Sequence, residues 1–94
     1  MNNVNTNSHQ GRNLVSELLQ SEFSSKLYDC IRNEFSKYGY SESEITYFLR
    51  SKWIRLDSNL DSVDVYFKDK KMFTVTVSAF NAGRHSIFTC TIQK

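Results

Sequence analysis

The chain has 94 residues, of which 39% are hydrophobic, and its formal net charge is +2. This length fits a single domain of roughly 100 residues, and the charge is too small for a histone-like polycation. No apolar run approaches the roughly 18 residues that a membrane span requires, so we expect no contact with membranes.

The first twelve residues are polar, with four asparagines among the first seven positions. Such a segment buries too little apolar surface to offset the entropy lost on ordering. We therefore predict a disordered tail over residues 1–12 and a single α+β domain over residues 13–94. The start also lacks the basic and apolar parts of a secretory signal. Because the sequence holds only two cysteines, we expect a reducing, cytoplasmic location.

A helical pattern starts at Asn13. Apolar residues recur at steps of three and four, which places them on one helix face: Leu14, Val15, Leu18, Leu19, Phe23, Leu27, Ile31 and Phe35. The serines near residues 21–25 favour caps over helix interiors. Two alternatives stay open: one helix over 13–38, or helices over 13–20 and 24–38 with a break near 21–24. Gly39 suits the end of this segment, because glycine readily adopts the left-handed cap conformation.

Ser41 and Glu44 have the spacing of a capping box, in which each side chain accepts a hydrogen bond from the other's backbone. The helix that begins there is predicted over 42–53. Basic residues near its end complement the helix dipole. Its core-facing residues are predicted to be Ile45, Phe48, Leu49 and Trp53.

After residue 61 the apolar period changes from about 3.6 to about 2, which is typical of strands. Three such runs, separated by short polar turns, predict strands over 62–69, 72–80 and 85–93. Helices followed by an antiparallel meander indicate an α+β fold with the helices on one face of the sheet. The edge strands of this meander are 62–69 and 85–93. The latter has no inward charge and no proline to discourage strand addition.

The sequence lacks the common catalytic motifs. Its glycines, at positions 11, 39 and 83, cannot form a phosphate-binding loop, and its cysteines and histidines lack the close spacing of zinc ligands. His85, beside Arg84, is the best candidate for acid–base chemistry, as in a small nuclease, but no orienting partner is evident. We therefore predict no enzyme, no cofactor and no metal, and we expect Cys30 and Cys90 to pack in the core.

The tyrosines favour a protein partner, because a core of this size cannot use all of them. Tyr47 and Arg50 lie one turn apart on the predicted solvent face of helix 42–53, and exposed Tyr with Arg is typical of interface hot spots. The candidate interface residues are Tyr47, Arg50, Tyr40 and Tyr66. We predict a small non-enzymatic protein-binding regulator: a stoichiometric inhibitor, an immunity-type protein or an adaptor. Strand 85–93 offers a further contact, to a partner's strand or to a second copy in a homodimer.

Nucleic-acid binding is the alternative, ranked second. The meander brings one turn and the last residue to the same end of the sheet, where lysines would grip phosphate. These are Lys68, Lys70, Lys71 and Lys94. A winged-helix arrangement is disfavoured, because Glu42 and Glu44 would occupy the start of the recognition helix beside base edges and phosphates.

Overall fold

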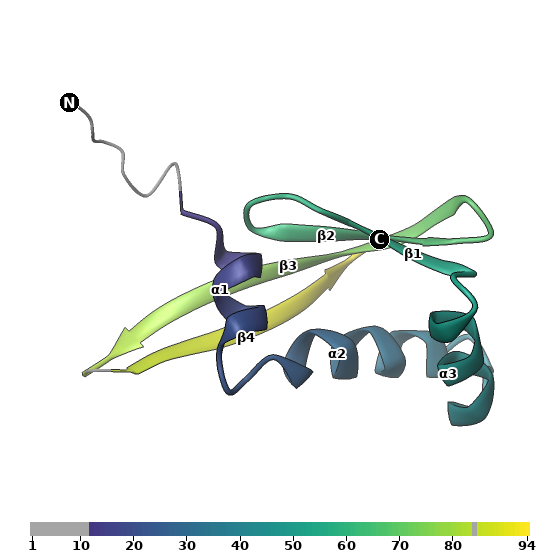
Figure 1. Ribbon diagram of the computed structural model, residues 1–94, viewed down its shortest axis with the longest axis horizontal. Coiled ribbons are helices and arrows are strands. Elements are labelled where there is room, and N and C mark those ends of the chain that lie inside the picture. The colour runs from purple at the N-terminus through teal and green to yellow at the C-terminus, as the bar shows by residue number, and fades with distance from the viewer. Residues whose placement is uncertain (1–11, 84) are drawn as a thin grey trace.

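The computed structural model describes residues 12–83 and 85–94, except for the side chains of Ala82 and His85. It has an α+β fold, in which three helices pack on a four-stranded antiparallel sheet (Figure 1). In chain order the elements are α1 (Leu14–Gln20), α2 (Ser25–Ser36), α3 (Glu42–Arg50), β1 (Ile54–Ser58), β2 (Ser62–Phe67), β3 (Lys70–Ala82) and β4 (His85–Gln93). Of the predicted tail, residues 1–11 lie outside the described residues, and Arg12 forms an ion pair with Glu17 at 2.9 Å.

The alternative with two N-terminal helices is the correct one. α1 begins after Asn13, whose side chain accepts a hydrogen bond from the backbone N–H of Ser16. The helix ends where Ser21 becomes extended. The Ser21 hydroxyl donates to the Leu18 carbonyl at 2.7 Å and accepts from the Phe23 N–H at 3.0 Å. A serine that bonds to the backbone in this way competes with helical hydrogen bonds, which explains the break.

The capping box of α3 is confirmed. The Ser41 hydroxyl accepts from the Glu44 N–H at 3.2 Å, and the Glu44 carboxylate accepts from the Ser41 N–H at 2.9 Å. The helix ends at Arg50 rather than at residue 53. It stops early because Lys52 adopts a left-handed conformation with a φ of 66°, after which the chain enters β1.

The sheet has four strands where the sequence predicted three. β1 pairs with β2 from Ile54 opposite Phe67 to Ser58 opposite Val63. The strand predicted over 62–69 is therefore not an edge strand, and that part of the prediction was wrong, because β1 occupies the edge. Apolar and charged residues alternate in β1 over too few positions to predict a strand. Its central Leu56 has a charged residue on each side, and the segment follows α3 closely.

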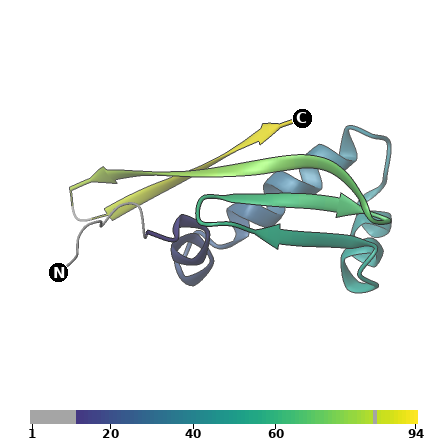
Figure 2. The same ribbon diagram turned by 90° about the horizontal axis from the view of Figure 1, so that it is seen from above.

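β3 is 13 residues long and pairs with two partners in turn. Its first part pairs with β2 and its last part with β4, and the two pairings overlap only at residues 74–76. The β3–β4 ribbon consequently projects beyond the β1–β2 hairpin (Figure 2). On the outer face of this ribbon Phe80 lies opposite Ile87, and Phe80 is 66% exposed. The ribbon thus carries an apolar pair on a face that is otherwise largely polar.

The core lies between the helices and the inner face of the sheet. Alternate residues of β2 and β3 enter it, as a period of two predicts. Its buried apolar residues are Val15, Leu18, Leu27, Ile31, Phe35, Ile45, Ile54, Val63, Val65, Phe73, Val75, Val77 and Phe88. Cys30 and Cys90 pack against this core while half-buried.

One charged side chain among the described residues is buried in this core. Glu34 is 2% exposed. Its carboxylate lies 2.8 Å from the Nζ of Lys94 and 3.5 Å from the Nζ of Lys37. The ion pair with Lys94 joins α2 to the residue that follows β4, and so fixes the end of that strand against the helix layer.

Candidate functional site

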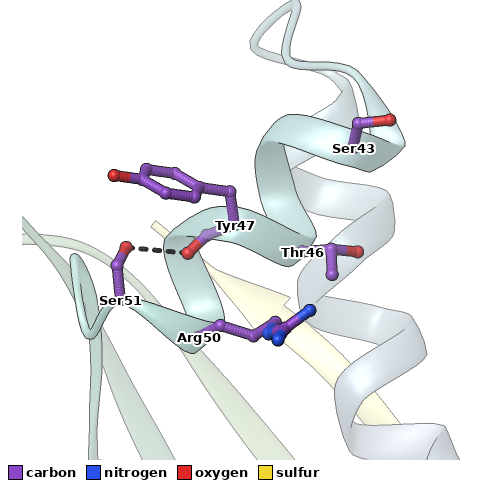
Figure 3. Close-up of a pocket in the computed structure, with 5 residues that line it drawn as sticks. All are labelled: Ser43, Thr46, Tyr47, Arg50 and Ser51. Carbon is purple, nitrogen blue, oxygen red and sulfur yellow. Dashed lines mark hydrogen bonds between the residues drawn. The ribbon is translucent and has the colours of Figure 1, made fainter.

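The exposed flank of α3 carries Tyr47 and Arg50, two of the residues predicted to form an interface. A hollow of about 440 Å³ lies along this flank and is lined by Ser43, Thr46, Tyr47, Arg50 and Ser51. The Tyr47 ring, whose residue is 58% exposed, extends from one side of the helix, whereas Arg50 extends from the other side together with Thr46, toward α2 (Figure 3). The two side chains border the same hollow from different directions.

Hydrogen bonds at the end of α3 fix the backbone beneath this flank. The Tyr47 carbonyl accepts from the hydroxyl of Ser51 at 2.7 Å and from its N–H at 2.9 Å. The Phe48 carbonyl accepts from the Trp53 N–H at 3.0 Å. These bonds turn the chain back against α3. Trp53 consequently lies at the surface with 41% exposure, which corrects the prediction that it faces the core from within the helix.

Cationic side chains lie over aromatic rings beyond the end of α3. The Nζ of Lys68 is 4.5 Å from the centre of the Trp53 ring. The guanidinium carbon of Arg55 is 4.1 Å from the centre of the Tyr66 ring. At these distances a cation is attracted to the negative face of the ring. Lys68 and Arg55 therefore have defined positions, although both are exposed.

The β2–β3 turn holds Lys68 in place. Lys68 and Asp69 both adopt left-handed conformations, with φ values of 52° and 66°, as in the two-residue hairpin turns that match the twist of the strands. The Lys68 N–H also donates to the Trp53 carbonyl at 2.9 Å. A second hollow, of about 250 Å³, lies here and is lined by Lys52, Trp53, Arg55, Lys68 and Asp69.

Phe48 connects the two hollows. Its ring stacks on that of Trp53 at 5.9 Å with an angle of 14°, and it meets the edge of Tyr47 at 6.2 Å. The exposed aromatic residues are therefore parts of one packed cluster. We call Tyr47, Arg50, Trp53, Arg55 and Lys68 the α3 surface. Sequence reasoning missed the contribution of Trp53 and Lys68, because their contact depends on β1.

The other two predicted interface residues occupy different positions. Tyr40 is half-buried, and its ring packs against Phe35, Phe48 and Phe67 at 5.2–6.2 Å. Its contacts belong to the margin of the core. Tyr66 is half-buried beneath Arg55 and so borders the α3 surface.

The lysines of the nucleic-acid alternative are divided among several partners. Lys71 lies 3.5 Å from the carboxylate of Asp64. Lys94 is paired with the buried Glu34, and Lys68 lies over Trp53. Two of the four predicted phosphate-binding lysines therefore already neutralise a carboxylate.

The perturbed pKa values of two carboxyls and two thiols bear on acid–base and nucleophilic chemistry. The ammonium of Lys94, 2.8 Å away, lowers the pKa of Glu34. The Thr74 hydroxyl, at 2.7 Å, lowers the pKa of Asp64. Both carboxyls therefore stay ionised near neutral pH, whereas a general acid needs a raised pKa. Burial raises the pKa of the Cys30 thiol and likewise that of Cys90, which disfavours the nucleophilic thiolate.

Among residues 12–83 and 85–94, no group of three or more His, Cys, Asp and Glu side chains is arranged to hold a metal ion. The side chain of His85, the candidate for nuclease chemistry, lies outside the described residues. No helix in the described part of the chain has the length and apolar character needed to cross a bilayer. No protein-family model matches this chain, and no curated protein or solved structure is significantly similar to it.

Proposed function

We propose that this protein is a non-enzymatic, stoichiometric protein-binding regulator, such as an inhibitor, an immunity-type protein or an adaptor, and that it contacts its partner through the α3 surface. The observation that carries the proposal is the exposed cluster of Tyr47, Trp53 and Arg50, beside which Arg55 and Lys68 lie over aromatic rings. We assign this function to the cytoplasm, because the free thiols of Cys30 and Cys90 suit a reducing compartment.

The residue types of the α3 surface support a protein partner. Tyrosine, tryptophan and arginine are the side chains most enriched at interface hot spots. Here the rings of Tyr47 and Trp53 are held by contacts with Phe48. A surface whose side chains are already fixed loses less conformational entropy on binding.

The charge of the α3 surface favours an acidic partner. Arg50, Arg55 and Lys68 are all exposed, and Lys52 lines the second hollow beside them. Two carboxylates offset part of this charge: Asp57 pairs with Arg55 at 3.1 Å, and Asp69 lines the second hollow. Carboxylates on a partner would form ion pairs with these cations and would increase the rate of association.

The same geometry gives less support to nucleic acid. Sequence-independent binding of single strands uses bare aromatic faces on which bases stack. Lys68 covers a face of Trp53, and Arg55 covers a face of Tyr66. A base that stacked on those faces would first have to displace the cation. The pairing of Lys71 and Lys94 with carboxylates removes further phosphate contacts.

The test is affinity capture from a lysate of the source cells, with and without nuclease, using the full chain. The variant Tyr47→Ala with Arg50→Ala removes the two large exposed side chains from the first hollow without touching the core. Each truncation of a hot-spot residue costs about 1–2 kcal/mol, so the double variant should bind the captured protein at least about tenfold more weakly.

The matched control is Tyr28→Ala, which removes an exposed tyrosine from α2. We expect it to bind like the wild type. Equal capture by the wild type and the double variant would refute the role of the α3 surface. A complex lost after nuclease treatment, with a steep dependence on salt, would favour the nucleic-acid alternative.

A further inference from the structure

β4 lies at one edge of the sheet. β4 has nine residues and pairs with β3 on one side. No strand pairs with its other side among residues 12–83 and 85–94. Residues 86–93 include neither a charged residue nor a proline. Long edges without charged residues of their own accept further strands, because most of their backbone groups are unpaired. At β4 the Phe88 carbonyl is an exception, since it accepts a hydrogen bond from Lys26 of α2.

Lys26 identifies the backbone groups that face outward. Its Nζ donates to the Phe88 carbonyl at 2.8 Å, so this carbonyl points away from β3. In an antiparallel sheet the N–H and C=O groups of alternate residues point to the same side. The groups of residues 86, 88, 90 and 92 therefore face outward, and those of residues 87, 89, 91 and 93 face β3.

α2 follows the β4 edge in the same direction. Lys26 reaches Phe88, Cys30 and Cys90 line the same hollow of about 400 Å³, and Glu34 is paired with Lys94. From Lys26 to Cys30 the helix advances about 6 Å, and from Phe88 to Cys90 the strand advances about 6.8 Å, so the two elements keep pace there. The long side chain of Lys94 spans the larger step to Glu34. The exposed residues of α2 that line the hollow are Lys26, Asp29 and Asn33.

We propose that β4 pairs antiparallel with β4 of a second copy, with the two-fold axis at Thr89. A two-fold axis through one residue of β4 pairs even-numbered residues with even-numbered residues, so the outward backbone groups of the two copies meet. The central registers place this axis at residue 88, 89 or 90. The axis at 89 pairs all nine residues and forms about eight backbone hydrogen bonds, against about six for either neighbouring register. The two sheets then form one continuous sheet.

Opposite charges on α2 support a second copy of this chain as the partner at the β4 edge. An axis at Thr89 places Phe88 opposite Cys90 of the second copy. Lys26 bonds to Phe88, and Asp29 lines the same hollow as Cys90, one residue before Cys30 on α2. In this register Lys26 therefore faces Asp29 of the second copy. The Phe88 carbonyl accepts from the Cys90 N–H of the second copy, and Lys26 turns to the carboxylate. The two-fold symmetry repeats this ion pair, so the second copy adds two charge contacts to the backbone hydrogen bonds.

The register is tested by a cysteine on the proposed axis. Thr89→Cys is made in the full chain with Cys30→Ser and Cys90→Ala, and oxidised glutathione is the oxidant. At the axis the two residues 89 form a non-hydrogen-bonded pair with Cα atoms about 4.5 Å apart, which is within disulfide reach. We expect a covalent dimer on a non-reducing gel. The control, Thr91→Cys, lies about 13 Å from its symmetry mate and should stay monomeric.

The charge pairing is tested by sedimentation equilibrium. Lys26→Asp alone and Asp29→Lys alone should each weaken dimerisation about tenfold or more, and the double swap should restore it. Circular dichroism of each variant checks that the fold is retained. A chain that remains monomeric at millimolar concentration would overturn the proposal, as would equal crosslinking of the Thr89→Cys and Thr91→Cys variants. These variants leave the α3 surface intact, so capture of a partner there should not change.

Discussion

The two edges of the sheet are built differently. β1 has five residues, and Arg55 and Asp57 form an ion pair within it. β4 has nine residues and no charged side chain over 86–93. Charged side chains and short length discourage strand addition at an edge. The β1 edge is therefore adapted to recognition by side chains, whereas the β4 edge presents backbone.

This difference separates two modes of contact on one small domain. At the β1 edge, the β2–β3 turn places Lys68 over Trp53, and Arg55 covers Tyr66. At the β4 edge, Lys26 of α2 reaches across to a strand carbonyl. Binding at one edge leaves the other accessible, because β2 and β3 lie between them.

The largest expected effect comes from a residue on which both edges depend. Phe35 is buried and contacts the rings of Phe67 in β2 and Phe73 in β3. Phe35→Ala should lower the free energy of unfolding by about 3–5 kcal/mol, with both edges lost in one cooperative transition. Urea unfolding followed by circular dichroism measures this. Phe80→Ala, which truncates an exposed phenylalanine, should change stability by less than about 0.5 kcal/mol; a comparable loss would contradict the assignment of the core.

The pH dependence of stability tests the ion pair between Glu34 and Lys94, at the end of β4. Lys94 lowers the pKa of Glu34 below the value of about 4.3 for a free glutamate. The pairing therefore stabilises the fold fully above about pH 4.3, and this contribution is lost as the pH falls through the lower folded pKa. Glu34→Gln should flatten the acid decline of the melting temperature. Some decline should persist, since the Thr74 hydroxyl lowers the pKa of Asp64 as well.

The control for this titration is Glu22→Gln, which alters an exposed glutamate in the α1–α2 connection. It should retain the wild-type pH profile. If Glu34→Gln also retained that profile, the ion pair with Lys94 would not be what anchors β4.

The smallest effect concerns the β1 side. Lys68→Gln removes the cation from the Trp53 ring but keeps the length of the side chain. We expect a loss of about 0.5 kcal/mol in stability and a change in tryptophan fluorescence, since Trp53 is the only tryptophan. Lys70→Gln changes the same charge two residues away and should leave the emission unaltered. Identical spectra for Lys68→Gln and the wild type would rule out the contact.

Local signals in the sequence predicted much of the fold. The spacing of Ser41 and Glu44 predicted the start of α3, and the serines near residue 21 allowed the break between α1 and α2. Both depend on hydrogen bonds between residues two or three apart, which composition and spacing reveal directly.

Features that depend on contacts between residues far apart in the sequence could not be predicted from local patterns. β1 has only two apolar residues, and it becomes a strand because β2 pairs with it. The contact of Lys68 with Trp53 follows from that pairing, so this half of the α3 surface could not be foreseen. Tyr47 and Arg50 were predicted together, since they lie one turn apart on the same helix, but their ends point in different directions (Figure 3).

The buried Glu34 has a consequence for the order in which the chain folds. Its carboxylate is synthesised 60 residues before the ammonium of Lys94 that compensates it. A helix that collapsed before Lys94 was made would have to desolvate this anion with only the compensation that Lys37 gives at 3.5 Å. We therefore expect α2 to pack stably against the sheet only after β4 has formed, so that the domain assembles as one unit.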